Sequence, residues 1–135
     1  MQPGNAPHDR GGTALTKLLD EADAIPDVFR KRLREKLMRT LSFAERVAAT
    51  EALEANARRA ASSLYHVTSA VLMSWEASRP NVDARRALMA RLILDHRLSP
   101  QDPLDVAAHD WEGDAAELIL AQRKIELAEV ASLLA

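Results

Sequence analysis

The chain has 135 residues, 47% of them hydrophobic and 28% charged, with a net charge of −2 and no cysteine. This length suits one domain with one core, and the lack of cysteine excludes disulfides, thiol catalysis and cysteine-ligated metals. No apolar run approaches the roughly 18–20 residues of a membrane span, and the first residues lack the apolar core of a signal peptide. We therefore expect a cytoplasmic protein with no membrane span. The slightly negative charge argues against a nucleic-acid partner.

The N-terminal residues predict a tail followed by a short helix. Residues 1–12 are rich in Gly, Pro and Asn and show no apolar period, so we expect them to be disordered. Thr13 is a suitable N-cap for a helix that ends near Ala22. Residues 13–135 are then expected to form a single helical-bundle domain.

A basic amphipathic helix is predicted next. Pro26 and Asp27 favour its start, and an apolar residue at every fourth position carries it to residue 41. Its other side gives residues 27–41 six cations and two acids, a net charge of +4. Such a face is usually only solvated, but it also suits an acidic partner, an anionic membrane or a nucleic acid. No aromatic residue is interleaved for base stacking, which weakens the nucleic-acid interpretation.

The central element is expected to be one long helix over residues 43–79. Ser42 and Glu45 form a capping-box pattern in front of it, and no Gly or Pro interrupts it, so its length would be about 55 Å. A kink at Ser62–Ser63 or Thr68–Ser69 is the alternative to a straight helix. The spacing of its apolar residues indicates a seam packed along other helices. The seam residues are Leu53, Ala57, Ala60, Leu64, Val67 and Val71.

Shorter neighbours cannot cover so long a helix completely, which predicts an interface. Leu72 and Trp75, near the end of the helix, are expected to lie exposed in a contact surface. Arg30 and Arg34 of the basic helix are the candidate charged residues of that interface, where charge sets orientation more than affinity.

A turn at Pro80–Asn81 precedes a buried third helix from Asp83 to about Leu98, in which Arg91 and Asp95 can pair across one turn. After a stiff loop, a capping-box pattern at residues 114–117 predicts a last helix to about residue 134.

Residues 102–135 carry eight acids and two bases, a net charge of −6. We therefore expect this acidic region to contact the basic helix, either within one chain or between two chains.

No catalytic or metal-binding group is expected. The four histidines lie in different segments without the i, i+4 spacing of a metal helix, and no Gly-rich loop could hold a phosphate. His66 lies one turn from Ser62 and Ser69, but without an orienting acid and an oxyanion hole it is better interpreted as a hydrogen-bonded structural histidine. Four arginines suit either an anion or ordinary surface ion pairs, and the second is the commoner case. They are Arg58, Arg59, Arg85 and Arg86.

Two stretches, RRAASSLYHVTSAVLMSWEAS and DARRALMARLILDHRLSPQDPL, resemble the C-terminal helical region of bacterial acyl-CoA dehydrogenases, over roughly residues 55–104. Those enzymes are flavoproteins with a helical N-terminal domain, a middle β-domain and a C-terminal four-helix bundle. The chain is too short for three domains and lacks Gly-rich flavin-contact loops and the catalytic glutamate motif, so no functional residue is carried over. The resemblance implies a detached C-terminal region, a small separate subunit or an appended extension that serves assembly.

These features predict an all-α fold, an antiparallel helical bundle of about four main helices with one long central helix. The expected function is a non-catalytic interaction or assembly module with no cofactor of its own, working as a homodimer or as a heteromer with a larger protein. One alternative is a component of a flavin-dependent acyl-CoA dehydrogenase, in which a partner chain completes the FAD site. The other is a basic-helix binder of an anionic membrane or nucleic acid.

Overall fold

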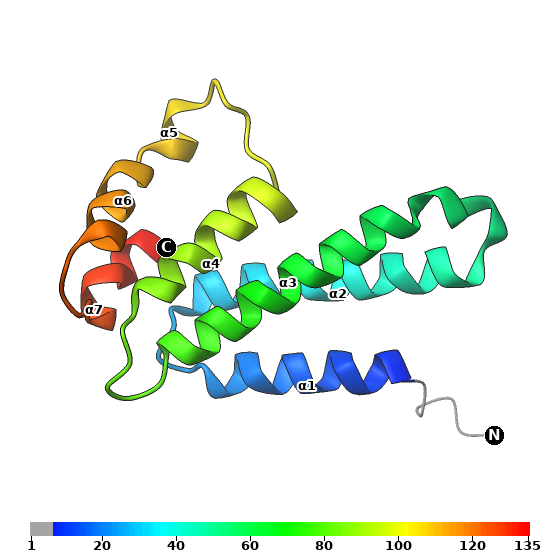
Figure 1. Cartoon of the computed structure of the whole chain (residues 1–135), viewed down its shortest axis with the longest axis horizontal. Coiled ribbons are helices and arrows are strands. Elements are labelled where there is room, and N and C mark those ends of the chain that lie inside the picture. The colour runs from blue at the N-terminus through cyan, green and yellow to red at the C-terminus, as the bar shows by residue number, and fades with distance from the viewer. Residues whose placement is uncertain (1–6) are drawn as a thin grey trace.

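The structure, a computed structural model, describes the backbone of residues 7–135 and the side chains from residue 11 onward, and this part of the chain is helical without any β-strand. The all-α fold is therefore confirmed. Four successive helices, α1 to α4, reverse direction, and shorter helices cover one end of α4 (Figure 1). The α-helices are α1 (Pro7–Glu21), α2 (Asp27–Ala49), α3 (Ala57–Ala77), α4 (Arg85–Ile93), α5 (Val106–His109), α6 (Glu112–Leu120) and α7 (Leu127–Val130). The 3-10 turns are η2 (Glu51–Asn56) and η4 (Ala131–Leu134), and η3 (Leu94–Leu98) is a π-helical turn.

Helix α1 begins at Pro7 rather than at Thr13, so the expected start of the first helix is wrong. The remaining part of the predicted tail, residues 1–6, lies outside the described residues. Gly12 is buried inside α1, and a Cβ atom there would lie only 2.8 Å from Cδ1 of Leu41 on α2. A glycine that is unfavourable for an isolated helix thus permits a close approach of two helices.

The predicted long helix over residues 43–79 is wrong, because the chain turns back in a helical hairpin of α2 and α3 (Figure 1). Helix α2 passes through Ser42 without a break and ends where Thr50 adopts an extended conformation, with φ −125° and ψ 108°. The buried face of α2 continues beyond Leu37 to Thr40 and Val47. Burial of this stripe against α3 outweighs the local capping preference at Ser42, because most helical stability comes from tertiary packing.

Helix α3 is central because it packs against α1, α2 and α4. The predicted seam is correct for Ala60, Val67 and Val71, which are buried, but Ala57 is exposed and Leu64 is half-buried. Leu53 of the seam lies in η2, outside α3, and is also half-buried. Small residues farther along α3 are buried and allow its neighbours to approach closely. They are Ala70, Ser74 and Ala77.

The predicted last helix is also wrong, because α6 and α7 are separate elements and Gly113 lies inside α6. The break is fixed by α4: the Arg85 guanidinium donates hydrogen bonds to the carbonyls of Ile119 and Ala121, each at 2.9 Å. An arginine can satisfy the free carbonyls at a helix C-terminus in this way. Ile125 is fully buried, and its carbonyl accepts a hydrogen bond from the Ala84 amide at 2.8 Å.

One buried carboxylate joins α2 to the end of α4. Asp95 is 5% exposed and pairs with Arg32 of α2 and, at 3.3 Å, with Arg91 of α4. The Arg91–Asp95 pair across one turn is thus confirmed. Arg91 also donates to the carbonyl of Leu133 and lies over the ring of Trp111, with Cζ 4.0 Å from the ring centroid. The C-terminal elements are therefore attached to the bundle through the same network.

We predict that Asp95→Ala lowers the free energy of unfolding by about 3 kcal/mol, since removal of one partner of a buried ion pair leaves the other charge uncompensated. Asp20→Ala is the matched control, because the Asp20–Arg34 pair is exposed and such pairs contribute about 0–1 kcal/mol. Urea unfolding of both variants provides the measurement. Equal losses would contradict the role assigned to Asp95.

Leucine-to-alanine substitutions in the hairpin should separate its core from its surface. Leu37 is fully buried, so Leu37→Ala is expected to cost about 2–5 kcal/mol. Leu64 is half-buried, so Leu64→Ala is expected to cost only about 1 kcal/mol from lost apolar contact. Urea unfolding distinguishes the two variants. A loss of unfolding free energy for Leu64→Ala as large as that for Leu37→Ala would indicate that Leu64 is part of the packed seam after all.

Candidate functional site

Three of the four predicted interface residues are engaged within the chain. Arg30 pairs with Asp27, and Arg34 pairs with Asp20. Nε1 of the half-buried Trp75 donates to a Glu21 carboxylate oxygen at 3.1 Å, and Arg79 lies 4.9 Å from the centroid of its ring. Leu72 is the exposed member, at 40%.

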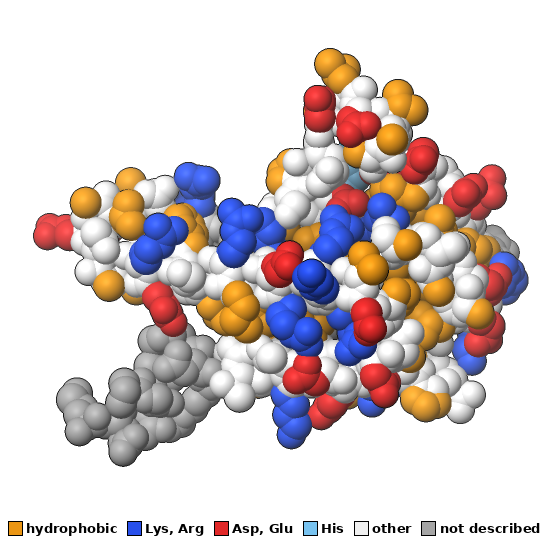
Figure 2. Space-filling view, turned by 180° about the vertical axis from the view of Figure 1, so that it is seen from behind, with side chains coloured by type: hydrophobic (Ala, Val, Ile, Leu, Met, Phe, Trp, Pro, Cys, Tyr) orange, Lys and Arg blue, Asp and Glu red, His pale blue; other side chains and the backbone are white. Residues whose placement is uncertain are grey.

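A second group of cations on α2 lines a hollow between α2, α3 and η3, which we call the basic hollow. Its volume is about 220 Å³. Figure 2 shows Lys and Arg side chains running from the hairpin toward the middle of the molecule. The lining residues of the basic hollow are Lys36, Arg39, Thr40, Phe43, Arg46, Arg59, Ser63 and Leu98.

The positive charge of the basic hollow is not neutralised inside the described part of the chain. No carboxylate there forms an ion pair with Lys36, Arg39 or Arg46. Burial and then the nearby charge of Arg39 lower the pKa of Lys36. Arg46 and Arg59 flank the ring of Phe43, with centroid distances of 5.8 and 6.0 Å, so the hollow combines cations with an aromatic surface.

Sequence reasoning missed the basic hollow because it ended the basic helix at residue 41. The sequence pattern predicts Phe43 and Arg46 on the long helix over residues 43–79, whereas the structure places both on α2. The aromatic residue that appeared to be absent among the cations is therefore present.

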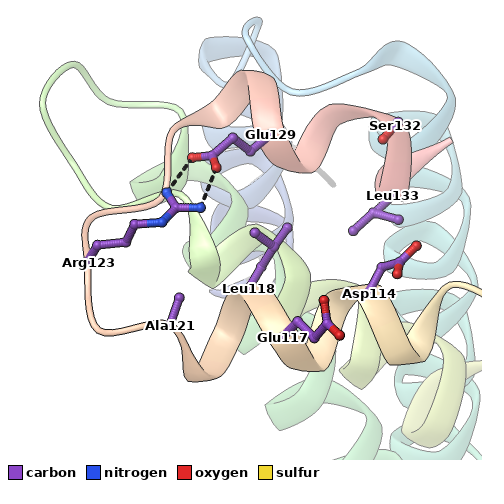
Figure 3. Close-up of a pocket in the computed structure, with 8 residues that line it drawn as sticks. All are labelled: Asp114, Glu117, Leu118, Ala121, Arg123, Glu129, Ser132 and Leu133. Atoms are coloured by element: carbon purple, nitrogen blue, oxygen red, sulfur yellow. Dashed lines mark hydrogen bonds and ion pairs between the residues drawn. The ribbon is translucent and has the colours of Figure 1, made fainter.

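A second hollow lies between α6 and the C-terminal turn, and we call it the acidic hollow (Figure 3). Its volume is about 430 Å³, and Asp114 and Glu117 project from α6 toward it. No described cation pairs with either of these carboxylates. Leu118 and Leu133 supply its apolar lining.

One side of the acidic hollow is closed by a two-bond ion pair, in which the guanidinium of Arg123 donates to the two Glu129 oxygens at 2.7 and 3.0 Å. Glu129 also accepts the Glu126 amide at 2.8 Å, which forms the capping box of α7. The Arg123 hydrogen bonds, followed by that from the Glu126 amide, lower the pKa of Glu129 to about 2. The Glu129 carboxylate therefore stays ionised at acidic pH values at which an ordinary glutamate would be protonated.

We predict that Arg123→Gln raises the pKa of Glu129 from about 2 toward its ordinary value of 4.5. Because the folded pKa is lowered, the stabilisation from this pair is present above pH 4.5 and is lost as the pH falls through about 2. An NMR titration of the Glu129 carboxyl carbon measures the midpoint. Lys124→Gln is the control, since Lys124 pairs with Glu126 at 3.8 Å, and an equal shift in that variant would contradict the assignment to Arg123.

A third hollow, of about 580 Å³, lies along the far part of the hairpin and is largely apolar. Its lining residues are Leu41, Ala44, Glu45, Ala48, Ala49 and Leu64. Three alanines on one part of α2 leave the surface shallow enough for another element to approach.

The histidines, which were considered as catalytic or metal-binding candidates, differ in the contacts they make. Nδ1 of His66 lies 2.8 Å from the carbonyl of Ser62, as expected for a structural histidine. His96 and His109, in contrast, meet Glu112, although their separation in the sequence did not suggest it. The side chain of His8 lies outside the described residues.

The four arginines that suit either anions or surface ion pairs are placed mainly in contacts within the chain. Arg86 pairs with Glu76, Arg85 pairs with Asp83 in addition to its carbonyl contacts, and Arg59 donates to Asn56. Of these four, Arg59 lines the basic hollow.

No protein-family model, curated protein or solved structure matches this chain. Within residues 7–135, none of the helices is both long and apolar enough to span a bilayer. The resemblance to the acyl-CoA dehydrogenase tail remains a prediction that these comparisons do not test.

Proposed function

We propose that this chain is a non-catalytic helical interaction module that self-associates, with the basic hollow of one copy facing the acidic hollow of another. The observation that carries the proposal is the pattern of ion pairing on α2. Three of the four cations toward its start, all arginines, pair with Asp20, Asp27 and Asp95. Lys31 and the cations around the basic hollow form no ion pair within the described part of the chain.

Among the described residues, no ion pair joins the two hollows within one chain. The basic hollow lies where the hairpin meets η3, and the acidic hollow lies beyond α4, between α6 and α7 (Figure 1). The acids of the C-terminal region that form ion pairs do so with histidines and with Arg123 and Lys124 rather than with α2. Of the two expectations for the opposite charges, contact between two chains is the one we adopt.

Both hollows also carry the apolar surface that a stable contact requires. Phe43 and Leu98 line the basic hollow, and Leu118 and Leu133 line the acidic hollow. A two-fold arrangement forms the same basic-to-acidic contact twice. The charges then select the orientation and speed association, while apolar burial supplies most of the affinity.

An assembly role agrees with one implication of the resemblance to the acyl-CoA dehydrogenase tail, an appended extension that serves assembly. A larger dehydrogenase-like partner that completes an FAD site remains the alternative. In that case the same unneutralised cations would face carboxylates of the larger chain.

A charge-reversal experiment tests self-association. Lys36→Glu with Arg39→Glu should weaken the homodimer at least tenfold, about 1.4 kcal/mol, and Asp114→Lys with Glu117→Lys should do the same. A mixture of the two double variants should associate again, because the mixed dimer has one unmodified contact and one contact with both charges reversed, and both are complementary. Sedimentation velocity at low and high salt measures the dissociation constants, and association of the unmodified chain should weaken as salt rises.

The control is Lys31→Glu, which changes charge at an exposed position of α2 outside the basic hollow and should leave the dimer intact. A monomer at every concentration, or equal dimerisation of all variants, would refute the proposal. Salt-sensitive binding of the monomer to RNA or anionic vesicles, abolished by the Lys36–Arg39 reversal, would favour the basic-helix binder instead.

A further inference from the structure

His96, His109 and Glu112 come together at the junction of η3, α5 and α6. One donor atom from each lies within 4.8 Å of the other two. Nε2 of His96 lies 2.6 Å, and Nδ1 of His109 lies 3.2 Å, from the same carboxylate oxygen of Glu112. Two imidazole nitrogens and a carboxylate thus point at one small volume, separate from the basic and acidic hollows.

The hydrogen bond on the far side of the His109 ring determines which of its nitrogens faces that volume. Nε2 of His109 lies 3.0 Å from the carbonyl oxygen of Asp102. Since a carbonyl oxygen only accepts, Nε2 carries a proton, and the Nδ1 that faces Glu112 is the nitrogen that an ion would bind in place of its own proton. A metal-ligating histidine usually donates its other ring N–H to a carbonyl or a carboxylate, as Nε2 of His109 does to Asp102.

We propose that His96, His109 and Glu112 form a binding site for a zinc-type divalent ion. Imidazole and carboxylate groups are ligands of Zn²⁺, at about 2.0–2.2 Å, and a tetrahedral ion places its donors about 3.3 Å apart. The distances in the cluster are close enough that small rotamer changes reach this geometry. The three side chains leave the fourth position to water or to a ligand from another molecule.

The position of the cluster indicates what the ion does. His96 lies on η3, His109 ends α5 and Glu112 begins α6, and the carbonyl of Asp102 brings in the intervening loop. That loop has few other attachments: Pro103, Leu104 and Asp105 are exposed. An ion there would cross-link elements that otherwise meet mainly through hydrogen bonds, and it would stabilise the folded chain by an amount that rises with the logarithm of its affinity.

The test is titration of the chelator-treated full-length chain with zinc chloride in a calorimeter. We expect one ion per chain and a rise in Tm with added zinc. His96→Gln and His109→Gln should each weaken binding at least tenfold, whereas His66→Gln and His8→Gln should leave it unchanged. Glu112→Gln, which is nearly isosteric, provides a further variant with loss of affinity if a histidine variant does not fold by circular dichroism.

A second measurement identifies the bound atoms. Nitrogen-15 NMR of the imidazoles should show zinc on Nδ1 of His109 and on Nε2 of His96, with Nε2 of His109 still protonated. A dissociation constant weaker than about 1 mM, or equal binding by the His109→Gln variant, would overturn the site. Zinc binding that instead follows His8 or His66 would have the same consequence.

Discussion

The arrangement of the helices depends on a single buried carboxylate. Asp95 accepts from Arg32 of α2 and from Arg91 of α4, so the basic helix and the fourth helix share one anion. Burial lowers the pKa of Arg91 despite this partner. Arg91 regains contacts from Trp111 and the Leu133 carbonyl. A buried pair of this kind is weak evidence for added stability, but its geometry defines how α2, α4 and the C-terminal turn meet.

The π-helical turn η3 connects this internal anchor with the histidine cluster. Its wider turn, closed by the Ser99 amide on the Leu94 carbonyl at 2.7 Å, accompanies burial of Leu94, Asp95 and Leu98. The residue between them in sequence, His96, is exposed and reaches Glu112. Turns of this type recur at functional sites in helices. Here one turn holds the core carboxylate inward and a metal-ligating side chain outward.

Local rules were sufficient where neighbours in sequence determine the outcome, as in the start of α2 beside Pro26 and the Arg91–Asp95 pair. They failed at Thr50, because no Gly or Pro interrupts residues 43–79 and the hairpin is selected by the packing of α2 against α3, where Thr40 and Val47 continue the buried face. The basic hollow was missed as a consequence, since Phe43 and Arg46 were placed on the wrong helix. The histidine cluster could not be predicted from the sequence, because only the fold brings His96 to His109 and Glu112. The three-residue spacing of His109 and Glu112 was a usable signal that these two lie on one face of a helix.

The distribution of charge along α2 separates structural cations from available ones. Arg32 pairs with Asp95. The pKa of Lys36, in contrast, is lowered by burial and then by repulsion from Arg39. A like-charge pair on a helix costs on the order of 0.3 kcal/mol, and one carboxylate placed opposite would remove that cost. Glu35 lines a neighbouring hollow together with Lys36 and Arg39 but forms no ion pair with either of them. Asp114 and Glu117, which pair with no described cation, lie on α6 at the acidic hollow. Repulsion that the chain does not relieve internally is the condition under which an anionic surface of another molecule gains most by binding, because each new ion pair also relieves the existing repulsion.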